Sequence, residues 1–381
     1  MIPVNPDKNR ILFFRVWPDP PIAKSVMDML VTHFPEYQID TFDILREIKK
    51  DWKTVVLNLF FSIKEYWLEM LFDGMAPKNA FIRTTFLFER IKAFAEEKIS
   101  HSTNLAFTFQ LQSLFDTSSG EIPNFVYTDH THLANFLYTE PKRFNHLITE
   151  WVVLEKTIYD NAAKIFTRST DISKSLIGQY EISEKKVECV FAGSNIYIEN
   201  EIIRESKYLN QEILFIGINW ERKGGAVLVE AFTKISSNYP NALLKIIGCN
   251  PGITHPRIRV LGKIPVDQLA QHYESASMFC LPTTNEPFGV VFVEAMSFGL
   301  PIIATITGAI PDMVRNGWNG YLIEPGDVEG LAGALVKLLS SPERCMQFGK
   351  NGKTLADKDY NWNSVGMKIR KQILEYLEEK V

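Results

Sequence analysis

Residues 278–305 read MFCLPTTNEPFGVVFVEAMSFGLPIIAT, and this stretch indicates how its region folds. Met278–Leu281 is a short apolar run ended by a proline, which is typical of a buried strand. The pattern predicts a helix over Val290–Phe298, because a glycine and then a proline follow it. A second apolar run, Ile302–Thr305, comes directly afterwards. Strand, loop, helix and strand in this order predict a parallel sheet that helices cover on both faces.

The same alternation extends through the rest of the chain. After about residue 205 it predicts strands at Ile213–Ile216, Leu243–Ile247 and Arg257–Leu261, and helices at Gly224–Ser237, Val266–Ser275 and Val328–Leu339. Before residue 195 it predicts strands at Ile11–Phe14, Gln38–Ile44, Phe125–Tyr127, Lys164–Thr167 and Val187–Phe191, and helices at Ile22–Phe34, Trp151–Ala163 and Ser169–Tyr180. The alternation occurs twice, so we expect two doubly wound α/β domains joined by a linker at Asn195–Gln211.

Residues 45–115 interrupt the first of these patterns. They are rich in Phe, Leu, Trp and Lys and nearly free of glycine, so we expect a helical insertion with helices at Trp52–Leu71, Arg83–Lys98 and Ala106–Phe115. The aromatic segment Trp52–Phe72 is expected to be core or a lid over the acceptor. A helix lying on a membrane surface, where it would serve a lipid acceptor, is the alternative.

Composition limits the kinds of partner. The chain has 381 residues, 46% of them hydrophobic, and a net charge of −4 with a pI near 6.0, so nothing global favours nucleic acid. The four cysteines form no CxxC pair, which predicts free buried thiols in a reducing compartment. The N-terminus lacks the apolar core and cleavage site of a signal peptide, and no run has transmembrane length. We expect a cytoplasmic protein, with peripheral contact at the inner membrane face left open.

Two glutamates stand out in the opening segment. Glu286 lies on a loop at the carboxyl end of a predicted parallel strand, where open α/β sheets bind ligands. The amides of Gly289, Val290 and Val291 open the following helix, and a helix N-terminus suits a diphosphate. Glu294 follows in the second turn, so one carboxylate could face a sugar and the other a ribose. The alternative is a solvated helix N-terminus with two acidic side chains.

This region resembles the retaining GT-B glycosyltransferases of family 4. Their hallmark is Glu, seven residues, Glu, with Pro-Phe-Gly after the first Glu, and the sequence has it from Glu286 to Glu294. Further matching motifs are Phe215-Ile216-Gly217, Arg222-Lys223-Gly224-Gly225, Gly308–Val314, Asn316–Leu322 and Tyr360-Asn361-Trp362. The resemblance covers about residues 160–365 and is loose over the first 120.

The resemblance implies a GT-B fold, with two Rossmann-like domains facing across a cleft. The acceptor-binding domain would span residues 1–195, including the helical insertion, and the donor-binding domain residues 205–358. Residues 359–381 would form a C-terminal helix that crosses back to the first domain.

The resemblance also implies roles for the donor-domain residues. Lys223 would hold the diphosphate, with Arg222 as the second cation, because the family's usual Arg is replaced by Ile218. Glu286 would bind the donor sugar and Glu294 the ribose. The implied donor-binding set is Arg222, Lys223, Glu286, Phe288, Gly289, Val290, Val291 and Glu294, with the backbone at Gly262-Lys263-Ile264 against the base.

The first domain contains one polar cluster, Tyr127–His132, which follows a predicted strand. In the family a histidine here contacts the donor sugar, so His130 joins Lys223 and Glu286 in the implied catalytic set. A His-x-His pair could instead bind a metal, but no third ligand is evident in the sequence. A loop histidine without a role is the remaining alternative.

The sequence therefore predicts a retaining glycosyltransferase that moves a sugar, most simply a hexose, from a UDP- or GDP-sugar. The acceptor would be a hydroxyl of an unidentified glycan, lipid-linked or small molecule, attacked by front-face substitution without a metal or other cofactor. Two alternatives stay open: a nucleotide-sugar epimerase or hydrolase of the same fold, and a non-catalytic GT-B protein that binds sugar.

Overall fold

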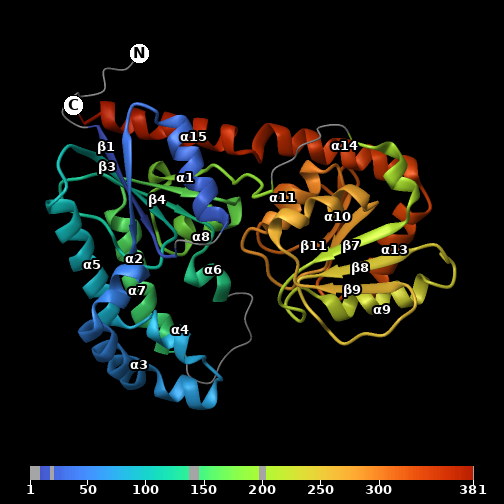
Figure 1. Cartoon of the computed structure of the whole chain (residues 1–381), viewed down its shortest axis with the longest axis horizontal. Coiled ribbons are helices and arrows are strands. Elements are labelled where there is room, and N and C mark those ends of the chain that lie inside the picture. Colours follow the sequence, from blue (N-terminus) through green and yellow to red (C-terminus); the bar gives the residue numbers. More distant parts are fainter. Residues whose placement is uncertain (1–8, 18–20, 137–145, 197–202, 381) are drawn as a thin grey trace. The chain divides into compact units, whose positions relative to one another are not determined.

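The computed structural model describes residues 9–17, 21–136, 146–196 and 203–380 (Figure 1). The chain divides into two compact units, one of Met1–Val190 with Gly366–Val381 and one of Phe191–Val365. The N-terminal residues 1–8, part of the proline-rich loop after the first strand and part of the predicted linker lie outside the described residues.

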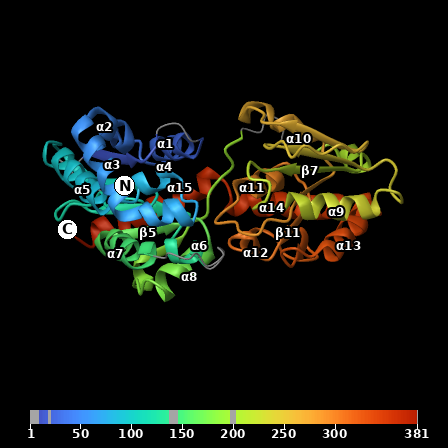
Figure 2. The same ribbon diagram turned by 90° about the horizontal axis from the view of Figure 1, so that it is seen from below.

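The first unit is built on a parallel sheet of six strands in the order β2-β1-β3-β4-β5-β6 (Figures 1 and 2). Their bounds are β1 (Arg10–Arg15), β2 (Gln38–Asp43), β3 (Leu105–Leu111), β4 (Asn124–Thr128), β5 (Lys164–Thr167) and β6 (Val187–Cys189). The chain builds outward from β1 to β2 and then returns to add β3 on the other side of β1. Loops that leave the sheet between β1 and β3 therefore diverge, which opens a crevice at this switch point.

Helices surround this sheet. They are α1 (Pro21–His33), α2 (Ile44–Lys50), α3 (Trp52–Phe72), α4 (Pro77–Phe81), α5 (Thr85–Ser100), α6 (His132–Phe136), α7 (His146–Asn161), α8 (Thr170–Gly178) and most of α15 (Trp362–Glu378). Helix α5 buries Leu87 and Ile91 in the same core as Leu12 and Phe14 of β1, so its apolar stripe decides which side faces the sheet.

The predicted helix at Ala106–Phe115 is wrong. Leu105–Leu111 is strand β3, which pairs with both β1 and β4, and all seven of its residues are buried. A strand buried on both faces shows no polar alternation, so its apolar run cannot be told from a buried helix by periodicity. The helical insertion therefore ends at Ser100.

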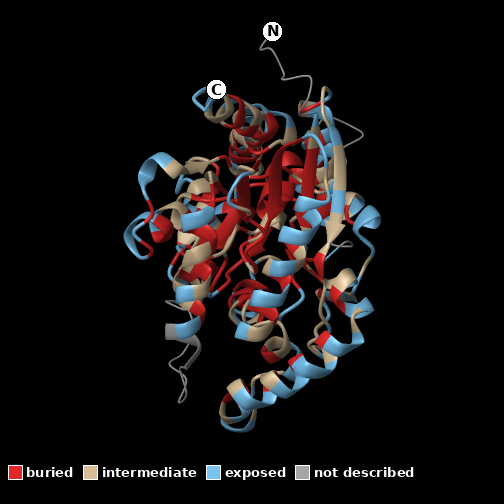
Figure 3. Ribbon diagram, turned by 90° about the vertical axis from the view of Figure 1, so that its left-hand side faces the viewer, coloured by how far each residue is buried: buried red, intermediate tan, exposed pale blue. Residues whose placement is uncertain are grey.

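The expectation that the aromatic side of α3 is core is also wrong. The residues of α3 that are buried are Thr54, Asn58, Ser62, Tyr66 and Glu69, and most of its large apolar side chains are exposed. Helix α3 is the lowest helix of the first unit in Figure 1, and much of the ribbon at this place in Figure 3 is pale blue, the colour of exposed residues. An ordinary surface helix buries its apolar side chains and exposes its polar ones, whereas α3 does the opposite.

The second unit has another six-stranded parallel sheet, in the order β12-β11-β10-β7-β8-β9. Its strands are β7 (Glu212–Ile216), β8 (Leu243–Ile247), β9 (Ile258–Gly262), β10 (Met278–Leu281), β11 (Ile302–Thr305) and β12 (Gly320–Ile323). Its helices are α9 (Gly225–Ile235), α10 (Ala270–Ser275), α11 (Val290–Ser297), α12 (Ile310–Met313), α13 (Val328–Leu339) and α14 (Pro342–Asp359). Short 3-10 turns at Glu184–Lys186, Glu205–Leu209 and Val266–Gln268 complete the described elements.

Three properties bear on the predicted environment. The four cysteines, all among the described residues, form no disulfide; Cys280 and Cys345 are buried, whereas Cys189 and Cys249 are only partly buried. Within the described residues, no helix combines the length and apolar character that crossing a membrane requires. Among these same residues, no group of three or more His, Cys, Asp or Glu side chains could hold a metal ion.

Candidate active site

The second sheet has its switch point between β7 and β10, and two loops meet there. Residues 217–224 follow β7 and residues 282–289 follow β10. The backbone oxygen of Arg222 accepts from the Thr284 amide at 2.8 Å and from the Thr283 hydroxyl at 2.9 Å. The Arg222 guanidinium in turn donates to the backbone oxygen of Asn285 at 2.5 Å. These hydrogen bonds connect the two loops directly.

Gly224 allows this close approach. Its φ is +69°, and a Cβ on it would lie 1.9 Å from the backbone oxygen of Pro282. No side chain other than hydrogen fits such a position. The glycine that follows Arg222-Lys223 in the sequence therefore sets how near the basic loop comes to the Glu286 loop.

Lys223 and Glu286 form a buried ion pair at the centre of this site. Burial lowers the pKa of Lys223, and the adjacent carboxylate of Glu286 opposes that shift. Arg222 adds a second cation, with its guanidinium 3.9 Å from the other carboxylate oxygen. Ile218, which replaces the family's usual Arg, is an exposed side chain.

The Glu286 loop is braced on its far side and leads directly into α11. The backbone oxygen of Glu286 accepts a hydrogen bond from the Ala309 amide at 3.1 Å. Gly289, with a φ of +81°, is the N-cap of α11, so the amides of the first helical turn come just after Glu286. The Phe288 side chain is buried, which makes it an anchor for this turn. A carboxylate and a helix N-terminus on one loop therefore lie beside two cations on the other.

Glu294 has different neighbours from Glu286. Its side chain is buried, and its carboxylate accepts from the Tyr273 hydroxyl at 2.9 Å and from the backbone amide of Asn195. Burial raises its pKa to about 7, although both hydrogen bonds oppose the rise. The prediction that the two glutamates share one donor stays a prediction, because in this structure Glu294 bonds to Tyr273 and Asn195, not to the Lys223–Glu286 pair.

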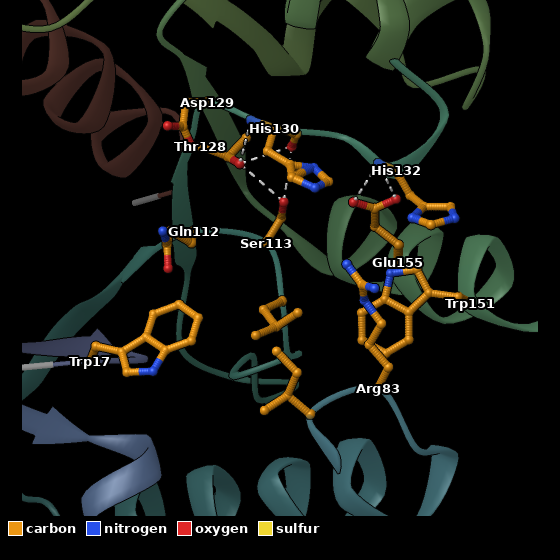
Figure 4. A pocket seen from close by; sticks show the side chains of 12 residues that line it. Trp17, Arg83, Gln112, Ser113, Thr128, Asp129, His130, His132, Trp151 and Glu155 are labelled. Carbon is orange, nitrogen blue, oxygen red and sulfur yellow. Dashed lines mark hydrogen bonds between the residues drawn. The ribbon is translucent and has the colours of Figure 1, made fainter. Parts of the chain in front are cut away.

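The first unit has its own pocket, of about 180 Å³, at the corresponding edge of its sheet (Figure 4). Trp17 follows β1, Gln112 follows β3 and Thr128 ends β4, so the pocket lies at the switch point of this sheet. The remaining lining residues are Ile82, Arg83, Ser113, Leu114, Asp129, His130, His132, Trp151 and Glu155. Two of the lining residues, Trp17 and Trp151, are tryptophans and give the pocket aromatic side chains.

Both histidines of the predicted cluster line this pocket. Burial lowers the pKa of His130, which Asp129 opposes and Arg83 reinforces. Burial, together with Arg83 and His130, lowers the pKa of His132 to about 4. At neutral pH both imidazoles are therefore uncharged and can donate or accept hydrogen bonds.

Glu155 closes the inner end of the pocket. Its carboxylate accepts from the His132 amide at 2.9 Å, from the Tyr159 hydroxyl at 2.9 Å and from the Tyr180 hydroxyl. Burial raises its pKa to about 7 despite these bonds. Glu155 therefore supports the backbone that carries His132.

Arg83 brings a cation to the same pocket. Its backbone oxygen accepts from the Tyr66 hydroxyl at 2.7 Å, which holds the residue in place. The guanidinium is not hydrogen-bonded to any other described residue, its buried Nε has no partner, and burial lowers its pKa. A desolvated guanidinium lining a pocket is suited to an anionic group of a ligand.

The structure brings Arg222, Lys223 and Glu286 together and keeps the carboxylate of Glu294 apart from them. His130 belongs to the pocket of the first unit. Sequence reasoning missed the pocket residues Trp17, Arg83, Trp151 and Glu155, and also Tyr273 and Asn195 beside Glu294. Trp17 could have been found, because it lies in the loop that follows the predicted strand Ile11–Phe14. The other five stand on helices and loops whose neighbours the sequence does not show.

Comparison with known proteins agrees with this geometry. Residues 199–355 match the family described as "Glycosyl transferases group 1". A D-inositol 3-phosphate glycosyltransferase of Corynebacterium kroppenstedtii is 25% identical over 56% of this chain and 53% of its own length. The sulfoquinovosyl transferase SQD2 of Arabidopsis thaliana is 28% identical over 65% of this chain and 51% of its own. The chain thus spans about half the length of the curated relatives it matches.

Solved structures extend the likeness to nearly the whole chain. Sucrose-phosphate synthase from Thermosynechococcus elongatus superposes with a TM-score of 0.68 at 18% identity, covering 98% of this chain and 100% of that one. HepE of Anabaena, in complex with UDP and glucose, gives 0.62 at 15% identity and covers 95% and 98%. The chain therefore has the GT-B fold, and its residues 199–355 are similar to the glycosyltransferase group 1 family.

Proposed function

We propose that the chain is a retaining glycosyltransferase that takes a sugar from a UDP- or GDP-sugar and passes it to an acceptor hydroxyl. The observation that carries the proposal is the buried Lys223–Glu286 pair at the switch point of the second sheet, beside the first turn of α11. HepE, whose fold the chain shares, was solved with UDP and glucose. The matched relatives are named as glycosyltransferases that differ in acceptor.

The donor would exchange the internal ion pair for contacts of its own. The diphosphate would take Lys223, Arg222 and the amides of Gly289 to Val291, all of which favour negative charge. Glu286, released from Lys223, would then accept hydrogen bonds from the sugar hydroxyls. The ribose would reach Glu294 by displacing Tyr273 or sharing its bond.

The acceptor would be received by the pocket of the first unit. Its tryptophans offer flat apolar walls and its neutral histidines offer hydrogen bonds, and His130 would contact the donor sugar near the reacting carbon. In the transfer step the leaving diphosphate would take the proton of the attacking hydroxyl on the same face of the sugar. Lys223 and the α11 amides would stabilise the charge that develops on the diphosphate, without a metal ion.

A nucleotide screen with one variant tests the donor site. We expect UDP or GDP to raise the melting temperature, since a ligand at a hundred times its Kd stabilises a protein by about 2.7 kcal/mol. Glu286→Gln keeps an acceptor for Lys223 but removes the charge, so it should retain nucleotide binding while turnover of the sugar nucleotide falls by at least about a hundredfold. Glu324→Gln, an exposed change in the same unit, should leave both unchanged.

Four results would count against the proposal. If no nucleoside diphosphate raises the melting temperature, the alternative of a non-catalytic GT-B protein is favoured. Release of free sugar only, with acceptors present, indicates a hydrolase, and an altered donor sugar indicates an epimerase. Full turnover by the Glu286→Gln variant would show that Glu286 has no role in the donor site.

A further inference from the structure

Helix α3 carries its apolar side chains on the outside of the first unit. Trp52 is 67% exposed, Phe60 and Ile63 are each 62% exposed, and Trp67 is 52% exposed. Val56, Leu57, Leu59 and Leu71 are exposed as well. Contiguous apolar surface of this extent is unusual on a soluble domain and marks an interaction surface.

Hydrogen bonds on the inner side hold α3 in this orientation. Asn58 donates to the Phe81 backbone oxygen at 2.7 Å and accepts from the Thr84 hydroxyl, while the Tyr66 hydroxyl donates to the Arg83 backbone oxygen at 2.7 Å. At the start of the helix, Asp51 accepts from the Arg90 guanidinium at 3.1 Å. Rotating the helix to bury its tryptophans would break these bonds and leave buried polar groups unpaired. The outward apolar face is therefore fixed by the fold.

The exposed charged side chains of α3 itself have one sign. The exposed charged residues of α3 are Lys53 and Lys64, and its two acids, Glu65 and Glu69, lie on the inner side, where Glu65 accepts from the Thr85 amide at 3.1 Å. The preceding helix α2 adds three exposed cations, Arg46, Lys49 and Lys50, of which Lys50 pairs with Glu47. Trp, Phe and Leu bordered by lysine is the composition of helices that lie at anionic membrane surfaces.

We propose that α3 docks the first unit onto an anionic lipid bilayer. The exposed side chains of Trp52, Phe60, Ile63 and Trp67 enter the boundary between headgroups and acyl chains, and Lys53 and Lys64 meet lipid phosphates. The segment that anchors α3 also carries Arg83 into the pocket, so docking and the acceptor site share one structural support.

A second copy of the chain fits this face less well. In a twofold dimer the same patch meets itself, so each copy would bring the cations Lys53 and Lys64 to an interface that already holds the same two cations. The face has no exposed acid on α3 to pair with them. Phosphate headgroups supply the missing negative charge.

Vesicle co-sedimentation of the full chain tests the proposal without any donor or acceptor. We expect binding to phosphatidylcholine vesicles with about 30 mol% phosphatidylglycerol, and at least about tenfold weaker binding to phosphatidylcholine alone. Phe60→Glu/Ile63→Glu should lower binding to the anionic vesicles by about tenfold or more, because each glutamate opposes insertion. Lys53→Gln/Lys64→Gln should reduce the preference for anionic lipid.

The matched control places the same charges on apolar residues that are equally exposed elsewhere. Val153 and Leu209 are 60% and 69% exposed, so Val153→Glu/Leu209→Glu should bind vesicles like the wild type. Equal melting temperatures of all variants would show that the fold is kept. Absence of vesicle binding, unchanged binding by Phe60→Glu/Ile63→Glu, or a solution dimer that this variant dissociates would each overturn the proposal. Because vesicle binding and donor binding are measured separately, either can fail alone.

Discussion

At the scale of single residues, two glutamates eight positions apart have different environments. Glu286 is buried against Lys223, and the positive charge offsets the cost of burying its own. Glu294 has a tyrosine hydroxyl and a backbone amide as partners but no cation, so burial dominates and raises its pKa to about 7. The sequence pattern treats the two carboxylates alike, whereas their neighbours make one of them titrate near neutrality.

Glu294 should make stability depend on pH. Its folded pKa lies above its unfolded one, so its contribution to stability is present below the unfolded pKa and is lost as pH rises through about 7. Glu294→Gln mimics the neutral form of the side chain. Between about pH 5 and about pH 8, the free energy of unfolding of the variant should therefore rise relative to that of the wild type, by about 2–3 kcal/mol at most.

Measuring the difference in unfolding free energy between wild type and Glu294→Gln isolates this effect from other titrations. Glu155, whose pKa is also raised to about 7, and His132, whose pKa is lowered to about 4, affect both proteins equally. If this difference in unfolding free energy is constant across the pH range, Glu294 is charged throughout and its side chain is in contact with water in solution.

At the scale of elements, the donor site depends on how closely two loops approach. Gly224 and Gly252 form a natural pair for testing this, because both have a φ of +69°. A Cβ on Gly224 would strike the backbone of Pro282, whereas a Cβ on Gly252 would meet nothing within 4 Å.

We expect Gly252→Ala to destabilise the chain by about 1 kcal/mol through its backbone strain alone. Gly224→Ala should cost about 2 kcal/mol more, because the loops must separate. Nucleotide affinity should fall only in Gly224→Ala. Thermal unfolding with nucleotide titration measures both quantities. Equal effects of the two substitutions would show that contact between the loops does not shape the site.

At the scale of the whole molecule, α15 contributes to both units. Its first turn lies in the second unit, where the Trp362 indole donates to the Ser194 backbone oxygen at 2.8 Å. From Gly366 onward it packs in the first unit, with Ile369 and Ile373 fully buried. Arg370 there donates to the His33 backbone oxygen at 2.7 Å and pairs with Glu36 at 2.6 Å. A segment that is last in the sequence completes the first unit.

Removing part of that contact should unfold the first unit selectively. Ile373→Ala should cost about 2–5 kcal/mol, the usual range for a truncated core isoleucine. Met367→Ala, at a half-exposed position of the same helix, should change stability by less than about 0.5 kcal/mol. Limited proteolysis should show early cleavage within residues 9–190 of Ile373→Ala while nucleotide binding by the second unit persists. If the first unit's resistance to protease and the second unit's nucleotide binding are lost together, the two units unfold as one.

The sequence by itself determined the features that depend on neighbours along the chain. The alternation of apolar runs and helices predicted two parallel sheets, and a strand followed by a loop and a helix placed Glu286 at a ligand-binding edge. The turn at Gly289 and the helix start after it follow from local backbone preferences.

Only the tertiary structure decided which distant groups meet. Lys223 reaches Glu286 across 63 positions because β7 and β10 lie side by side in the sheet. The outward apolar face of α3 depends on hydrogen bonds to residues 81–90, and β3 is a strand because β1 and β4 bond to it on either side. Local propensity contains no term for these pairings, since they arise when elements far apart in sequence bury each other's surfaces.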